Sequence, residues 1–231
     1  IQFLKKKLDK NTIKFNSSVE QIDFNKDIIK LSFNNDEITC DYLIISDGVF
    51  SKGKSLISKN QSKPIYNDTI AIRGNISKKN LKNTNNENIS LFLGSNFHYV
   101  VYPISKDKDL NFIGILKYKL NLEDQKNYNL FNENIFTENI KVKLSQKISQ
   151  NVFKNLQNIK LFPVFVSKNL YNPPKNIFLL GDAFFAFSPS FAQGASQSIE
   201  GAHQLYECIL NKNDKYYNIR LKRVKMINSR S

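Results

Sequence analysis

The sequence has very few of the residues that build metal centres and disulfide frameworks. Its 231 residues include two cysteines, Cys40 and Cys208, and two histidines, His98 and His203. Their spacing matches no metal-ligand motif, so we expect no metal site. Two distant cysteines are also typical of a reduced, cytoplasmic protein.

Long hydrophobic runs are missing as well. No stretch of 18 or more apolar residues exists, which excludes a membrane-spanning helix. The first residues, IQFLKKKLDK, lack the apolar stretch and small-residue cleavage site of a signal peptide. Because the chain begins with Ile1 and its only methionine is Met226, we expect a fragment whose N-terminal piece is missing.

Acidic residues are scarce relative to basic ones. The 20 Asp and Glu against 34 Lys and Arg give a net charge of +14, which raises the question of nucleic-acid binding. Thirty of the basic residues are lysines scattered among asparagines, without a basic-aromatic motif. We therefore expect no nucleic-acid partner, and a basic module that binds nucleic acid or an anionic membrane is the remaining alternative to an enzyme.

The length and the 41% hydrophobic content suit one large domain or two small ones. Apolar residues alternate over 29–33, and after a turn at 34–37 the segment 38–40 returns as the second strand of a hairpin. Residues 42–46, YLIIS, are apolar at consecutive positions, which is typical of a central parallel strand covered on both faces.

The middle of the chain is rich in β-prone runs. TIAIRGNI, NISLFLGS, HYVVYPI and LNFIGILKYKL, all within 65–120, predict an antiparallel sheet of about four strands. A further strand follows at 161–166, where Pro163 favours an edge position.

Helical periodicity appears in three places. Residues 136–156 carry apolar side chains at every fourth position, which predicts one amphipathic helix. A second helix is expected at 194–211, after a buried strand at 177–180, and the basic residues 220–230 continue as helix. The expected apolar face of the second helix comprises Ile199, Ala202, Tyr206, Ile209 and Leu210.

Two carboxylates stand where strands end: Asp47 in LIISDG and Asp182 in IFLLGD. Ligands of open α/β sheets bind beyond the carboxyl ends of parallel strands, and a carboxylate there accepts hydrogen bonds from sugar hydroxyls. An adjacent glycine lets the ligand approach the backbone. The alternative is that each aspartate only caps a turn or helix.

Gln193-Gly194 marks a predicted helix start. Free amide groups and the positive end of the helix dipole favour a negatively charged ligand group there. The alternative is a glycine needed only for tight packing.

Taken in order, these motifs resemble the flavin-dependent monooxygenases of the aromatic-hydroxylase type, which include salicylate hydroxylase and para-hydroxybenzoate hydroxylase. DYLIISDGVFSKGK is similar to their second dinucleotide motif, and IFLLGDAFFAFSPSFAQGASQSIEGA to their Gly-Asp motif with its loop and helix start. RGNI, FHYVVYPI and LNFIGI are similar to the substrate-domain sheet of the salicylate-hydroxylase branch.

The resemblance implies an α/β fold with α+β features. An FAD-binding Rossmann-like domain of three layers, incomplete at its N-terminus, would comprise 1–60 and 167–231. A substrate-binding domain with an antiparallel sheet would comprise 61–166. The family's glycine-rich βαβ unit, which holds the adenosine half of FAD, is absent, so we expect the isolated chain to bind FAD weakly or not at all.

The resemblance also implies roles for single residues. Asp182 would bind a ribitol hydroxyl of FAD, and Asp47 and Gly48 would lie near the pyrophosphate and the path of the nicotinamide. Pro189 would border both the flavin and the substrate. The remaining positions implied to lie at the cofactor are Gly181, Ala183, Gln193, Gly194, Ala195 and Ser196.

The implied reaction uses NADH or NADPH to reduce the flavin, after which O₂ adds to give a flavin hydroperoxide that hydroxylates a small aromatic substrate. Such chemistry requires that water be excluded. The phenylalanines Phe184, Phe185, Phe187 and Phe191 are candidates for a dry wall, with core packing as the alternative. His98 and Tyr102 are candidates for substrate contact.

Several departures from the family leave the substrate open. Phe184-Phe185 replace a frequent Ala-His, Gly201 a frequent acidic residue, Ser196 a frequent asparagine and Lys54 the usual arginine. Arg73 is a candidate counter-charge for a carboxylated substrate. A related flavoprotein, such as a ubiquinone-pathway hydroxylase, an epoxidase or a reductase, is the enzymatic alternative, and the resemblance is also compatible with a homodimer.

Overall fold

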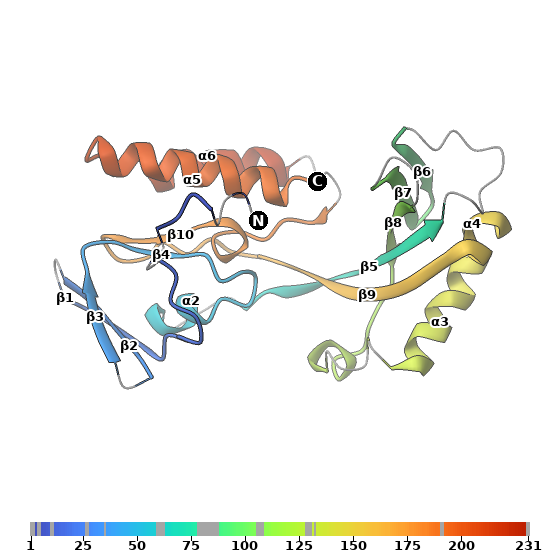
Figure 1. Ribbon diagram of the computed structural model, residues 1–231, viewed down its shortest axis with the longest axis horizontal. Helices are drawn as coiled ribbons and strands as arrows, with labels where there is room; N and C mark the ends of the chain where they lie inside the picture. Colours follow the sequence, from blue (N-terminus) through green and yellow to red (C-terminus); the bar gives the residue numbers. More distant parts are fainter. Residues whose placement is uncertain are drawn as a thin grey trace. The chain divides into compact units, whose positions relative to one another are not determined.

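The computed structural model describes residues 3, 6–9, 12–25, 28–34, 36–58, 63–77, 88–104, 109–127, 131, 133–189 and 192–229. The chain divides into two compact units (Figure 1). The first unit joins Ile1–Pro64 to Ser167–Ser231, and the second unit is the intervening Ile65–Val166.

The centre of the first unit is a pair of parallel strands, β4 (Leu43–Ile45) and β10 (Ile177–Leu179), with Ile45 opposite Leu179. Their consecutive apolar residues place side chains on both faces of the pair. Ile45, Ile177 and Leu179 form one core with Ile22, Ile29 and Leu31 of the neighbouring antiparallel sheet. That sheet has the order β1-β2-β3, with β1 at Gln21–Asn25, β2 at Ile28–Phe33 and β3 at Asp36–Cys40.

The alternating pattern at 29–33 correctly predicts β2, because Ile29, Leu31 and Phe33 are buried. The return strand is also confirmed, although it begins at Asp36, so the turn is shorter than 34–37.

Helices cover the other face of the parallel pair. Phe178 packs in a core with Leu205 and Cys208 of α5 (Gly194–Leu210) and Tyr216 of α6 (Tyr216–Asn228). Figure 1 shows α5 and α6 running together on one side of β4 and β10, with β1–β3 on the other. The short helix α2 (Lys52–Ile57) follows β4, and the 3₁₀ turn η4 (Gly181–Ala183) follows β10. The first unit is therefore built in three layers.

Two expectations about this unit are wrong. The apolar face predicted for α5 is not its core face, since the buried residues of the helix are Gln197, Gly201, Leu205 and Cys208. Of the predicted face, Ile209 packs against the core, whereas Ile199, Ala202, Tyr206 and Leu210 are exposed. Likewise β4 is not covered on both faces, because Ile44 is 47% exposed.

The second unit is a five-stranded antiparallel sheet of order β6-β7-β8-β5-β9, as the β-prone runs predict. Its strands are β5 (Ile65–Ser77), β6 (Ser90–Gly94), β7 (Phe97–Pro103), β8 (Asp109–Lys117) and β9 (Leu156–Val166). Pro163 lies in β9, an edge strand, as expected. Ile65 pairs with Val166, so the two ends of the unit are adjacent.

One face of this sheet packs against α3 (Asn134–Ser145) and α4 (Gln150–Asn155), while the short 3₁₀ turn η2 (Asp124–Lys126) precedes them. The single helix expected at 136–156 is wrong. A new helix begins after Ser149, whose side chain accepts a hydrogen bond from the amide of Val152. The apolar period of four continues through the break, which is why the pattern alone does not reveal it.

In the part of the chain that the structure describes, no helix combines the length and the apolar character needed to cross a bilayer.

We predict that Leu144→Ala lowers the free energy of unfolding by about 2–5 kcal/mol, because Leu144 is fully buried between α3 and the sheet. Urea denaturation followed by circular dichroism measures this. Val142→Ala on the same helix is the control, since Val142 is 60% exposed. Equal losses for both variants would contradict the packing described.

Candidate functional site

The candidate site lies where β4 and β10 end. Because the two strands are parallel and Ile45 stands opposite Leu179, the segments that follow them leave the same edge. Asp47 and Gly48 follow β4, and Gly181 and Asp182 follow β10. The structure thus brings both strand-end carboxylates to one edge of the parallel pair.

Gly181 makes a close approach that no other residue allows. Its φ of +61° lies in the left-handed region. A Cβ atom at this position would lie 2.9 Å from Oγ of Ser198 in α5. Ser198 in turn donates a hydrogen bond to the carbonyl of Gly194 at 2.9 Å. The end of β10 therefore rests directly against the first turns of α5.

Asp182 lies beside the first residue of α5. Its Oδ1 is 4.0 Å from the position that a Cβ of Gly194 would occupy. The residue is exposed, yet the surrounding protein removes part of the water from its carboxyl group, and this desolvation raises the pKa of Asp182 above its usual value. A hydrogen-bond donor from a ligand would compensate for the lost hydration.

The start of α5 offers free backbone donors. Gln193 is the N-cap residue, but its side chain makes no capping hydrogen bond, and the first turn contains no acidic residue. The first intrahelical bond of the helix runs from the amide of Gln197 to the carbonyl of Gln193. No carbonyl within α5 accepts from the amides of Gly194, Ala195 and Ser196, so these amides can donate to a ligand or water at the positive end of the helix dipole.

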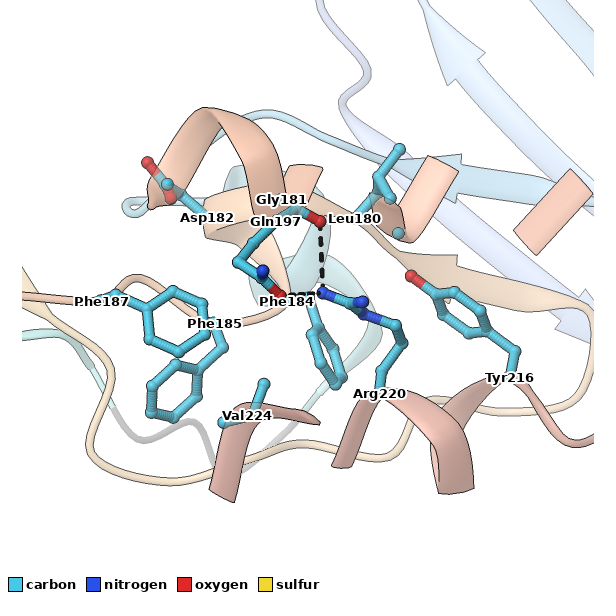
Figure 2. Close-up of a pocket in the computed structure, with 12 residues that line it drawn as sticks. Leu180, Gly181, Asp182, Phe184, Phe185, Phe187, Gln197, Tyr216, Arg220 and Val224 are labelled. Carbon is cyan, nitrogen blue, oxygen red and sulfur yellow. Dashed lines mark hydrogen bonds between the residues drawn. The ribbon is translucent and has the colours of Figure 1, made fainter. Parts of the chain in front are cut away.

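Asp182 and Gly194 line the same small cavity. Figure 2 shows Asp182 with the larger side chains that line it. The rings of Phe184, Phe185 and Phe187 gather on one side of it, and Arg220 and Tyr216 lie on the other. The cavity offers about 10 Å³ to the centre of a water molecule, which is room for about one water. A larger ligand must therefore lie outside this cavity, over the exposed Asp182 and the start of α5.

A buried arginine closes the inner end of this cavity. Arg220 of α6 is 2% exposed and donates to the side-chain and backbone oxygens of Gln197 at 2.9 and 3.2 Å. It also forms an ion pair with Glu200 at 2.9 Å, and Glu200 pairs with Arg223 at 3.2 Å. The first turns of α5 are thereby fixed to α6.

Asp47 has a local structural partner. Its Oδ2 accepts a hydrogen bond from the amide of Gly53 at 2.7 Å, which holds the start of α2. Gly48 has a φ of +88°, which permits the sharp turn between them. The alternative that Asp47 only caps a turn or helix therefore explains the role of one of its two carboxylate oxygens.

Lys54 joins the two strand ends. It is 8% exposed, and its Nζ donates to the carbonyl of Ala183 at 3.3 Å. Burial lowers the pKa of Lys54, and the negative charge of Asp47 opposes that shift. Sequence reasoning noted Lys54 only as a departure from a family motif and missed this contact.

The other predicted residues of this unit differ in position. Ala183 is buried in the core and its carbonyl accepts from Lys54, whereas Ala195 and Ser196 are exposed. Pro189 is half-buried, and its carbonyl accepts from the amide of Ala192. Phe184 and Phe185 are buried in the core as well as lining the cavity. Phe191 lies outside the described residues.

His98 and Tyr102 belong to the second unit. They lie on the same face of β7, half-buried, opposite the face whose Phe97, Tyr99 and Val101 enter the core. Arg73 of β5 lies on their face too, because Ile113 of β8 pairs with both Val100 and Arg73. The guanidinium of Arg73 lies 5.7 Å from the ring centre of Phe162.

Sequence reasoning also missed the roles of Ser198 and Arg220. Gly201 could have indicated the second of these, since a Cβ there would lie 3.5 Å from Nε of Arg220 and 3.2 Å from Leu180. Among the described residues, no cluster of three His, Cys, Asp or Glu could hold a metal ion.

No protein-family model matches the sequence, and no curated protein matches it. Solved structures do match. HpxO of Klebsiella pneumoniae, in complex with FAD and uric acid, has a TM-score of 0.78 at 16% identity over 99% of this chain and 60% of its own. A salicylate hydroxylase in a substrate complex has a TM-score of 0.78 at 16% identity, over 100% of this chain and 63% of its own.

A third similar structure is 2,6-dihydroxypyridine-3-hydroxylase from Arthrobacter nicotinovorans, with a TM-score of 0.77 at 15% identity, over 90% of this chain and 59% of its own. The chain therefore has the mixed α/β fold, with antiparallel sheets, of the FAD-dependent aromatic hydroxylases. It spans about three fifths of the length of these neighbours.

We predict that Gly181→Ala destabilises the protein by at least about 1 kcal/mol, because alanine is strained at positive φ and its Cβ meets Ser198. The double variant Gly181→Ala/Ser198→Ala should recover only the part of the lost stability that is due to the contact between the new Cβ and Ser198. Gly194→Ala is the control, since its Cβ would have 4.0 Å to the nearest atom. Thermal unfolding measures the stability of all three variants. A Gly181→Ala variant as stable as the wild type would contradict the geometry described for Gly181.

We predict that Asp182→Asn stabilises the protein at neutral pH. The pKa of Asp182 is raised in the native state, so the native state holds this proton more tightly than the unfolded chain, whose pKa is about 3.9. The contribution of Asp182 to stability is thus complete below about pH 3.9 and is lost as the pH rises through the native pKa.

The melting temperature of Asp182→Asn should therefore exceed that of the wild type at pH 7 and approach it as the pH falls. Asp182→Glu keeps a titrating carboxyl group and should retain the pH dependence. A constant difference between Asn variant and wild type at every pH would exclude the desolvated carboxylate as its cause.

Proposed function

We propose that this chain is part of an FAD-dependent monooxygenase that uses NADH or NADPH and O₂ to hydroxylate a small aromatic compound. The observation that carries the proposal is the juxtaposition of the Asp182 carboxylate and the uncapped start of α5 at the carboxyl end of a parallel strand pair. The fold supports it, because HpxO, which shares this fold, binds FAD.

The residues present fit the chemistry of FAD. The desolvated carboxylate of Asp182 can accept a hydrogen bond from a ribitol hydroxyl, and Gly181 lets the end of β10 rest against α5 so that Asp182 lies beside the start of that helix. The amides of Gly194, Ala195 and Ser196 can donate to the electron-rich carbonyl edge of an isoalloxazine. Bound FAD would supply the redox chemistry of the hydroxylation.

The chain's own contribution to catalysis is electrostatic. The positive end of the α5 dipole favours negative charge next to Gly194, and no acidic residue in the first turn neutralises it. Arg220 fixes the carbonyl of Gln197 and so holds these amides in place. Since preorganised donors need no rearrangement when charge develops, they stabilise it more than water would.

The face of the second unit that carries Arg73, His98 and Tyr102 is the candidate substrate surface. Its half-buried aliphatic residues Val100 and Ile113 suit an aromatic ring, and Arg73 suits a carboxylate. HpxO, which shares this fold, was crystallised with uric acid, a polar ring compound.

Isotope labelling tests the reaction. In the complete gene product, NADH or NADPH should be consumed with an aromatic substrate such as salicylate, and ¹⁸O₂ should place one oxygen-18 atom in the product, as mass spectrometry detects. Reduction of the flavin by NADH or NADPH without labelled product from a panel of aromatic acids and N-heterocycles would instead favour the reductase alternative.

The cofactor site is tested separately by FAD binding. In the complete gene product, Asp182→Ala should weaken binding of FAD by about 10–100-fold, because it removes a charged hydrogen-bond acceptor worth about 1.5–3 kcal/mol. Asp214→Ala, which removes an exposed aspartate before α6, is the matched control. Flavin fluorescence quenching measures both affinities, and equal affinities would contradict the assigned role.

A further inference from the structure

The sheet face that carries Arg73, His98 and Tyr102 changes in character from one edge to the other. The strand register places one residue of each strand in a row across this face: Lys160 of β9, Arg73 of β5, Ile113 of β8, Val100 of β7 and Leu91 of β6. The first four each adjoin a core residue in sequence, and Leu91 adjoins Phe92, whose ring stacks on Tyr99 of the core. Because neighbouring residues of a strand point to opposite faces, the row lies on the face away from α3 and α4.

One end of the row is cationic. Arg73 and Lys160 stand opposite each other on β5 and β9, and both are exposed. Within the described part of the chain, neither forms an ion pair with an acidic side chain. Like charges on directly opposite residues of two strands are unfavourable, and an anion bound between them relieves the repulsion. This end of the face therefore suits an anionic group.

The other end of the row is aliphatic and exposed. Leu91 is 56% exposed, and Leu93, which shares its face because it pairs with His98, is 79% exposed. Both belong to the edge strand β6, which carries no charged residue, although edge strands commonly carry charges that keep other molecules away. Exposed apolar residues that adjoin polar ones are typical of binding surfaces.

The two ends are separated by more than the size of one aromatic ring. Three steps between neighbouring strands, each about 4.8 Å, lead from Arg73 on β5 to Leu91 on β6, so the row extends over about 14 Å. A ring whose carboxylate lies at Arg73 would cover Ile113 and leave Leu91 and Leu93 in water. The length of the row thus calls for a longer ligand.

We propose that this face binds an amphiphilic aromatic acid, in which an apolar tail extends from the ring. The carboxylate lies at Arg73 and Lys160, the ring covers Ile113, and an alkyl or alkenyl tail runs over Val100 to Leu91. The inference rests on the proposed function, since it takes this face as the substrate surface and adds the class of substrate.

Charge argues for this occupant over a second copy of the chain. A second copy could cover the leucines of β6, but it carries a net charge of +14 and would bring further positive charge toward Arg73 and Lys160. An anionic amphiphile satisfies both ends of the row at once.

The test is isothermal titration calorimetry of the complete gene product with benzoate, 4-propylbenzoate and 4-hexylbenzoate, without NADH or NADPH. Each added methylene group should lower the Kd about twofold, because full burial would give about fourfold and one side of the tail stays in water. The hexyl compound should therefore bind at least tenfold more tightly than benzoate.

Two variants separate the two ends of the face. Leu91→Ser should reduce the gain per methylene group and leave the Kd of benzoate unchanged. Arg73→Gln should weaken the binding of all three acids about tenfold and leave the gain per methylene group unchanged. Leu122→Ser, which replaces another exposed leucine of the same unit, is the control and should bind all three acids like the wild type.

A Kd that does not depend on tail length would overturn the inference, as would a gain per methylene group that Leu91→Ser does not reduce. A dimer that Leu91→Ser dissociates, in a protein that binds none of the three acids, would also overturn it in favour of a second copy. Because the titration needs no turnover, the two proposals can fail separately. Oxygen-18 in the product without dependence on tail length would refute this inference alone, whereas dependence on tail length without labelled product would refute only the proposed reaction.

Discussion

The candidate site depends on one constraint: the end of β10 must lie against the start of α5 with no side chain between them. Gly181 meets this constraint, because its positive φ turns the chain at the strand end and a Cβ would lie 2.9 Å from Ser198. Asp182 consequently emerges beside Gly194. The Asp182 carboxylate thereby shares one small region with the amides at the start of α5, whose hydrogens carry partial positive charge, and no hydrogen bond joins the two groups in the described part of the chain.

The helix α6 stabilises the positions of β10 and α5 through two kinds of contact. Arg220 fixes the first turns of α5, and the hydroxyls of Tyr216 and Tyr217 bond to the backbone of β10. Burial raises the pKa of Tyr216 to about 12 and raises that of Tyr217 as well, so both phenols keep their protons at neutral pH. The strand and the helix that form the site are thus attached to the same third element.

Local sequence patterns predicted those features of the fold and the site that are determined by residues close together in the sequence. The alternation in β2, the strands of the central sheet and the carboxylate at the end of β10 all follow from such patterns. The break before α4 was missed because an apolar period of four continues through it. The buried face of α5 was not predicted, because two of its residues, Gln197 and Gly201, are not strongly apolar. Gln197 contacts Arg220, and Gly201 lies close to Arg220 and Leu180. Contacts between distant segments, such as that of Lys54 with Ala183, leave no local pattern.

The pairing of Ile65 with Val166 has a further consequence for the history of this fold. The second unit begins and ends at residues that are adjacent in space. Its removal or exchange therefore leaves two chain ends that a short connection can join. A lineage can therefore replace the sheet that carries Arg73, His98 and Tyr102 without rebuilding the strands and helices around Asp182. Exchange of such an inserted unit is one route by which a single scaffold acquires different binding surfaces.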